Sequence, residues 1–230
     1  MSIILNANGQ AFDTNAARRD VALIGADGSV LPKAAQAWAM SGVTGDTAST
    51  YAAVLEAIRC RIAVAPNANQ SRTLESELRG WNAAMISTLS KLSVDCGAMV
   101  RAFAGDGAKP LAVYAMEKVR QIASALTQAN RNLLDRYTEP MLINAAHNAN
   151  ALRNKAALVT LSREVTYTET EQQQSIIARH RCAPSTASTQ ASSSRMALRA
   201  IGACRYDERD RSMSLTDAPV TRALLALVGQ

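Results

Sequence analysis

Aromatic residues and histidines are scarce in this chain. Aromatics make up 4% of its 230 residues, and there are only two histidines. Because strands favour aromatic and β-branched side chains, a β-sandwich fits this composition poorly. Hydrophobic residues nevertheless reach 48%, many of them alanine, leucine, isoleucine, valine and methionine. The composition therefore favours closely packed helices.

Long apolar runs are also missing. No run approaches the roughly 18 residues of a membrane span, so we expect no transmembrane segment. The first apolar run, Ile3 to Leu5, is too short for a secretory leader, and no positive charge precedes it. We therefore expect cytoplasmic synthesis without a signal peptide. A chain whose leader had been replaced by methionine would look the same, and it would be periplasmic.

The common signatures of catalysis are absent. The serine motif G-x-S-x-G does not occur, and the pieces GADGS and GDGAK lack the spacing of phosphate-binding loops. Cysteine catalysis needs a base beside the thiol. His180 lies two positions from Cys182, where helical geometry would point it away, and nothing in the sequence pairs His147 with a cysteine. We expect no enzyme activity, no catalytic residues and no cofactor.

The four cysteines, Cys60, Cys96, Cys182 and Cys204, form no C-x-x-C pair, so the sequence predicts no zinc site. Two disulfides are conceivable. Cys182 and Cys204 would face each other if a helix ended near each, and Cys60 would face Cys96 across antiparallel helices. Four free thiols fit equally well, and the missing leader favours them.

Residues 1–45 differ from the rest and predict a small β segment or an extended arm. Asp27-Gly28 stands between apolar runs in VALIGADGSVLP, which is a hairpin signal. Ile3 to Leu5 would add a third strand. The alternative is an arm that pairs only on a neighbouring molecule.

Residues 46–181 predict a helical bundle. A first helix would begin at Asp46 or Thr47. The clearest signal is a 3-4 apolar spacing that predicts one long helix packed at a shallow angle. Its members are Leu74, Leu78, Trp81, Met85, Leu89, Leu92, Cys96, Met99 and Phe103. Further helices are predicted over about 111–137, with Asn130 inside the apolar stripe, and over about 140–180. The predicted fold is mainly α, with long antiparallel helices.

Residues 182–230 predict a Ser/Thr-rich connector and short helices. Pro184 would stop the preceding helix, and STASTQASSS would be either a linker or the start of a helix. SRMALRAIGAC is expected to be helical and YDERDRSMS to be charged surface. Asp217 would cap a last helix over APVTRALLALV.

Positive charge is in excess, with a net charge of +6 and a pI of about 9.4. Arginines gather in the C-terminal third, and arginine suits bidentate phosphate contacts. They are Arg179, Arg181, Arg195, Arg199, Arg205, Arg209 and Arg211. Asp207, Glu208 and Asp210 lie among them, so a salt-bridged surface is the alternative.

The features combine into two functional hypotheses. Long helices and amphipathic ends favour a non-enzymatic structural or assembly subunit, partnered by copies of itself or other subunits. The settings considered are the virion of a bacterial virus and a bacterial secretion or conjugation apparatus. The alternative is a nucleic-acid-binding module that uses the arginines. A steep salt dependence of nucleic-acid binding would distinguish the alternative.

Overall fold

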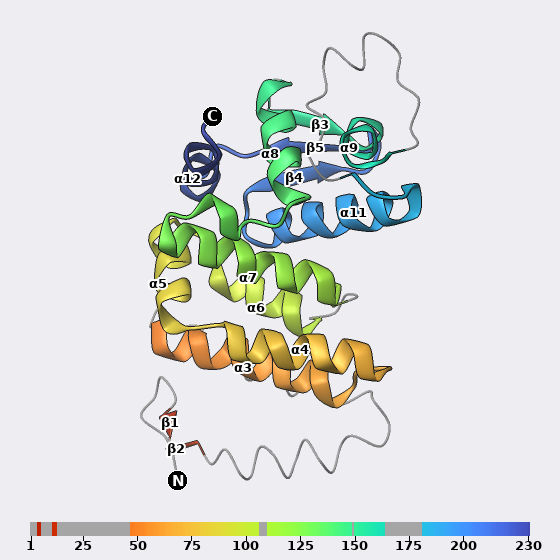
Figure 1. Cartoon of the computed structure of the whole chain (residues 1–230). Helices are drawn as coiled ribbons and strands as arrows, with labels where there is room; N and C mark the ends of the chain where they lie inside the picture. The colour runs from red at the N-terminus through yellow and green to blue at the C-terminus, as the bar shows by residue number, and fades with distance from the viewer. Residues whose placement is uncertain (1–3, 6–10, 13–46, 106–109, 149, 164–180) are drawn as a thin grey trace. The chain divides into compact units, whose positions relative to one another are not determined.

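The computed structural model describes residues 4–5, 11–12, 47–105, 110–148, 150–163 and 181–230. These residues are mainly helical and include a small three-stranded antiparallel sheet (Figure 1). The chain divides into two compact units, one of residues 1–87 and 95–113, the other of residues 88–94 and 114–230. The predicted mainly α class is confirmed.

The first unit is built on α3 (Thr47–Ala63), which packs against α4 (Ala68–Gly80) and α6 (Cys96–Ala104). Its core includes Val54, Ile58 and Phe103, all fully buried. Trp81 packs edge-on against Phe103, with ring centroids 6.0 Å apart. These apolar contacts between helices hold the unit together.

Two very short strands near the N-terminus, β1 (Ile4–Leu5) and β2 (Ala11–Phe12), pair antiparallel. The hairpin predicted around Asp27-Gly28 lies outside the described residues, as do Asp46 and the rest of 13–46. The hairpin and the alternative extended arm therefore stay predictions.

The single long helix predicted from the apolar spacing is wrong. The chain forms α4, α5 (Ala83–Lys91) and α6 in succession. Asn82 Oδ1 accepts the N–H of Met85 at 3.1 Å, and Asp95 Oδ1 accepts that of Ala98 at 2.8 Å. Short polar side chains of this kind compete with helix continuation and cap a new helix instead.

The second unit holds the sheet. Its elements are most of α7 (Val113–Gln128), η1 (Arg131–Leu133), α8 (Thr138–His147), β3 (Ala151–Arg153), α9 (Asn154–Leu161), α11 (Pro184–Ala200), β4 (Cys204–Asp207), β5 (Ser212–Leu215) and α12 (Pro219–Val228). The strand order is β3-β5-β4. Helix α8 packs against β3 and β5, and α11 packs against β4, α8 and α9 (Figure 1).

The third and fourth predicted helices are both shorter than expected. Helix α7 ends at Gln128, and Asn130 is exposed and caps η1 through the N–H of Asn132 instead of lying in an apolar stripe. A helix over 140–180 does not form, because the chain turns into β3 after α8 and then into the short α9. Residues 164–180 lie outside the described part.

The C-terminal region differs from the prediction at Pro184 and in the charged stretch, whereas the predicted helix up to Ala200 is present. Pro184 does not stop a helix but starts one, since it lies in the first turn of α11, where its missing N–H costs nothing. The Ser/Thr-rich stretch is part of this helix, with Ala187 and Ala191 buried at its packing face. The charged stretch after it forms the β4–β5 hairpin.

The last helix, α12, is where it was predicted, with Pro219 in its first turn and Ala218 as the N-cap. Asp217 does not cap it and instead pairs with Arg222 at 2.6 Å. The apolar face of α12 packs on α8 within the unit. No helix in the described part of the chain is long and apolar enough to cross a membrane.

Candidate functional site

The arginines that the sequence singled out lie around α11 and the β4–β5 hairpin. Arg195 and Arg199 stand four residues apart on α11 and so share one side of that helix. Arg205 is on β4, while Arg209 and Arg211 are in the hairpin turn. Arg181 lies just before α11 and is half-buried, and Arg179 lies outside the described residues.

One face of the sheet is polar and open to solvent. Antiparallel register pairs Arg153 with Ser212 and Arg205 with Ser214, and directly opposed residues share a face. Arg153 and Arg205 are exposed there together with Asp207. Leu152, Met213 and Cys204 are buried on the opposite face. The sheet thus presents arginine and serine side chains to solvent.

Asp207, the last residue of β4, is engaged by the backbone of the hairpin turn, which also contains Glu208 and Asp210. Asp207 Oδ1 accepts the N–H of Arg209 at 2.7 Å and that of Asp210 at 3.3 Å. Among the described residues, no carboxylate forms a salt bridge with Arg195, Arg199, Arg205, Arg209 or Arg211. The salt-bridged surface considered from the sequence therefore does not form around these five arginines.

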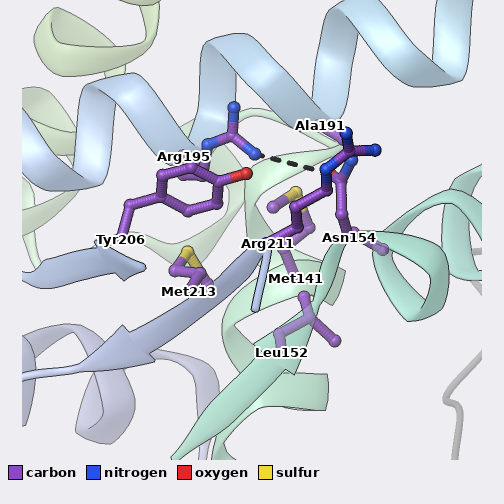
Figure 2. Close-up of a pocket in the computed structure, with 9 residues that line it drawn as sticks. Met141, Leu152, Asn154, Ala191, Arg195, Tyr206, Arg211 and Met213 are labelled. Atoms are coloured by element: carbon purple, nitrogen blue, oxygen red, sulfur yellow. Dashed lines mark hydrogen bonds between the residues drawn. The ribbon is translucent and has the colours of Figure 1, made fainter. Parts of the chain in front are cut away.

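A small pocket lies where α8, α9, α11 and the sheet meet (Figure 2). Its inner wall is apolar, and the described residues that line it include no carboxylate. The lining residues are Met141, Leu152, Asn154, Ala157, Ala191, Arg195, Tyr206, Arg211 and Met213. The cavity measures about 10 Å³, room for about one water molecule. It is too small to enclose an organic substrate.

The polar side chains of the pocket are held in place by one another. The guanidinium carbon of Arg195 lies 3.9 Å from the centre of the Tyr206 ring, a cation–π contact. Arg195 Nη1 also donates to Asn154 Oδ1 at 3.4 Å. The carbonyl of Arg211 accepts the N–H of Asn154 at 2.9 Å, which fixes the hairpin against α9.

Asn154, Tyr206 and Arg153 are candidate site residues that sequence reasoning missed. Their roles follow from the β4–β5 hairpin, for which the sequence predicted only a charged surface stretch. A signal was present, because Cys204 and Tyr206 alternate with polar residues, as do Met213 and Leu215. That period of two on both sides of a polar turn is typical of a hairpin.

None of the four cysteines, which all lie in the described residues, is part of a disulfide. Cys182 and Cys204 lie beyond opposite ends of α11, whose 17 residues span about 25 Å. A disulfide needs Cα atoms within about 7 Å, so the structure keeps this conceivable pair apart. Cys60 and Cys96 are both buried and unbridged.

Two of these thiols are chemically quiet. Burial raises the pKa of Cys204 to about 12. Burial, reinforced by the nearby Glu56 carboxylate, raises the pKa of Cys60 to about 11. The nucleophile is the thiolate, which these sites disfavour at neutral pH. In the described part of the chain, no group of three or more His, Cys, Asp or Glu residues could hold a metal ion.

A buried ion pair lies elsewhere in the second unit. Lys118 pairs with Asp135 and lies 5.3 Å from the centre of the Tyr137 ring. Burial lowers the pKa of Lys118, and the Asp135 carboxylate opposes that shift. Asp135 Oδ2 also accepts the N–H groups of Tyr137 and Thr138 at 3.0 and 2.8 Å. The pair thus anchors the start of α8, a structural task.

Comparison with known proteins adds no assignment to this geometry. No family model, no curated protein and no solved structure matches the chain. The arginine-bearing face and pocket of the second unit are therefore interpreted from their own chemistry.

Proposed function

We propose that this chain binds nucleic acid, without catalysis of its own, through phosphate contacts made by arginines of the second unit. The observation that supports the proposal best is the absence of salt bridges to five of these arginines. Arg195, Arg199, Arg205, Arg209 and Arg211 form no salt bridge with any described residue. An unpaired guanidinium keeps its donors for phosphate oxygens.

The charge balance of this region supports the same proposal. Residues 150–163 and 181–211 contain nine lysines and arginines but three aspartates and glutamates. Arginines are carried by α11, by the open sheet face and by the hairpin turn, so the unit offers guanidinium groups to phosphates from several of its elements. Contacts of this kind position a nucleic acid without reading its sequence.

Sequence-independent binding is the expected mode. Proteins that prefer single strands stack bases on aromatic rings. Tyr206 is the aromatic residue in this cluster, and Arg195 already covers one face of its ring. Affinity should therefore come from charge and depend steeply on salt.

The test is a salt series on the purified full chain. Fluorescence anisotropy would follow binding of a labelled 20-nucleotide strand between about 50 and 200 mM NaCl. If about four phosphates are contacted, the log–log slope of the binding constant against salt is about −3 for a single strand. Absence of binding at 50 mM, or binding indifferent to salt, would contradict the proposal.

An assembly subunit is the second candidate function. The exposed hydrophobic side chains indicate how such a subunit would associate. Among the described residues, the large hydrophobic side chains that are exposed are Val64 at 44% and Tyr114 at 55%. Two isolated residues do not make an apolar interface. We propose that copies, as in a virion of a bacterial virus or a secretion or conjugation apparatus, associate along a shared nucleic acid.

Light scattering separates this assembly from simple self-association. The chain alone should have the mass of a small species, and a long nucleic acid should gather many copies into one particle. Copies that assemble equally well without nucleic acid would contradict an assembly that depends on it.

A further inference from the structure

The pocket beside Asn154 differs from the open arginine face in being preorganised. Stacking on Tyr206 and the hydrogen bond to Asn154 hold the Arg195 guanidinium in one orientation. That orientation leaves further N–H donors of a planar five-donor group unused. Figure 2 shows Arg195, Asn154 and Arg211 gathered on one side of the pocket.

The shape of the pocket limits what enters it. Met141, Leu152 and Met213, each 2% exposed, close its inner side. Arg211 is exposed and marks the open side. The enclosed space of about 10 Å³ suits a single oxygen atom rather than a base or a sugar. A ligand must therefore enter end-on, with small polar atoms first.

We propose that this pocket binds the terminal phosphomonoester of a nucleic-acid strand, an inference that rests on the proposed function. One phosphate oxygen would occupy the cavity, and the others would bond to the guanidinium groups of Arg195 and Arg211. A phosphomonoester carries a charge of about −1.5 to −2 and three strong acceptor oxygens. A phosphodiester inside a strand carries one charge and has a nucleotide attached on both sides, so it fits an end-on pocket less well.

Competition binding tests the inference on the full-length protein. Three unlabelled versions of one 12-nucleotide strand would compete with a labelled reference strand. One carries a 5′-phosphate, one a 3′-phosphate and one no terminal phosphate. We expect at least one phosphorylated strand to compete about tenfold better than the unphosphorylated strand, the size expected for a charge-assisted bond.

Two variants assign that preference to the pocket. Arg211→Gln removes an exposed charge at the mouth, and Arg195→Gln removes the stacked guanidinium. Both should lose the preference for the terminal phosphate. Arg205→Gln, on the sheet face outside the pocket, serves as the matched control. It should weaken all three strands equally and keep the preference.

The outcomes separate the pocket from the nucleic-acid proposal. Equal competition by all three strands would overturn the pocket assignment and leave the proposed function standing. If no strand binds, the proposed function and the assignment of the pocket to a strand terminus both fail, and a melting temperature that inorganic phosphate raises in the unaltered protein but not in Arg211→Gln would show that the pocket takes free phosphate instead. A preference that survives both pocket variants would overturn the assignment.

Discussion

Single residues decide how the elements end, and Gly105 is the clearest example. It terminates α6 with φ 87°, and its N–H donates to the carbonyl of Arg101 at 2.8 Å. A Cβ built there would lie 2.9 Å from Pro110 Cβ. Gly202, with φ 74°, has no atom within 4 Å of the same position. Substitution of either glycine would strain the backbone, but only substitution of Gly105 would also cause a steric clash.

Gly105→Ala should destabilise the protein more than Gly202→Ala. A left-handed alanine costs about 1 kcal/mol at either site, and overlap with Pro110 should add about 1–3 kcal/mol at position 105. Urea unfolding would measure both variants. Equal losses of unfolding free energy would show that Pro110 moves away without cost.

The thiols give a second test at the residue scale. Cys182 is half-buried, whereas Cys60, Cys96 and Cys204 are buried. At pH 8 we expect one thiol per folded chain to react quickly with Ellman's reagent and the full set of four only after unfolding. Cys182→Ser should remove the fast reaction. A fast phase that persists in this variant would contradict the burial of the other three.

The pKa shifts reinforce this difference between the thiols. The pKa of Cys204 in the folded state, about 12, lies above its ordinary value of 9.0. The stability that this protonated thiol contributes is therefore complete below about pH 9. It is lost as the pH rises towards 12. In the folded chain, Cys204 should stay unreactive at any pH used for labelling.

At the scale of elements, buried polar groups join helices that are distant in sequence. The Thr138 hydroxyl at the start of α8 hydrogen bonds to Asp135 Oδ2 at 3.0 Å and to Ser194 Oγ on α11 at 2.9 Å. Thr138 and Ser194 are both fully buried. An unpaired buried polar group is costly, so this contact helps to fix α8 against α11.

Thr138→Val keeps the shape of the side chain and leaves Asp135 and Ser194 without this hydroxyl. We expect unfolding free energy to fall by about 1–3 kcal/mol. Ser194→Ala should cost less in the Thr138→Val background than in the unaltered protein, and a double-mutant cycle would measure that coupling. Additive effects of the two substitutions would show that the hydroxyls do not interact.

The apolar spacing predicted which side chains are buried better than it predicted the length of the helix that carries them. Leu74, Met85 and Phe103 are buried as their spacing indicated, although three helices carry the pattern. Asn82 and Asp95 each cap a new helix, so the predicted long helix is divided into three. The seven-residue spacing of apolar residues does not reveal where one helix ends and the next begins. The sequence allowed either a linker or the start of a helix for the Ser/Thr-rich stretch, and the helix forms because packing of its alanines outweighs a weak intrinsic preference.

The sequence predicted the arginines of the candidate site but not the residues that hold them in place. Composition alone identified the arginines, because their charge needs no fold to be noticed. Asn154 and Tyr206 become site residues only when β4 pairs with β5 and α9 abuts the hairpin turn. The alternating residues indicate the pairing of β4 with β5, but the contact between α9 and the hairpin turn, which are far apart in sequence, has no signature in a single chain.

At the scale of the whole molecule, the described elements of the proposed site belong to the second compact unit. The first unit also carries exposed arginines, among them Arg72 and Arg79 on α4. The two sets have the same charge and differ in their surroundings. Comparing them therefore tests whether binding depends on a particular surface or on net charge alone.

The most direct measurement compares two double variants of equal charge in the same nucleic-acid binding assay. Arg199→Gln with Arg205→Gln removes two guanidiniums from the proposed surface, and Arg72→Gln with Arg79→Gln removes two from α4. We predict that the first pair weakens binding at least tenfold and reduces the salt slope by about 1.4 for a single strand, two phosphate contacts at about 0.7 each. We predict that the second pair changes binding little. Equal weakening by both pairs would contradict the proposed binding surface.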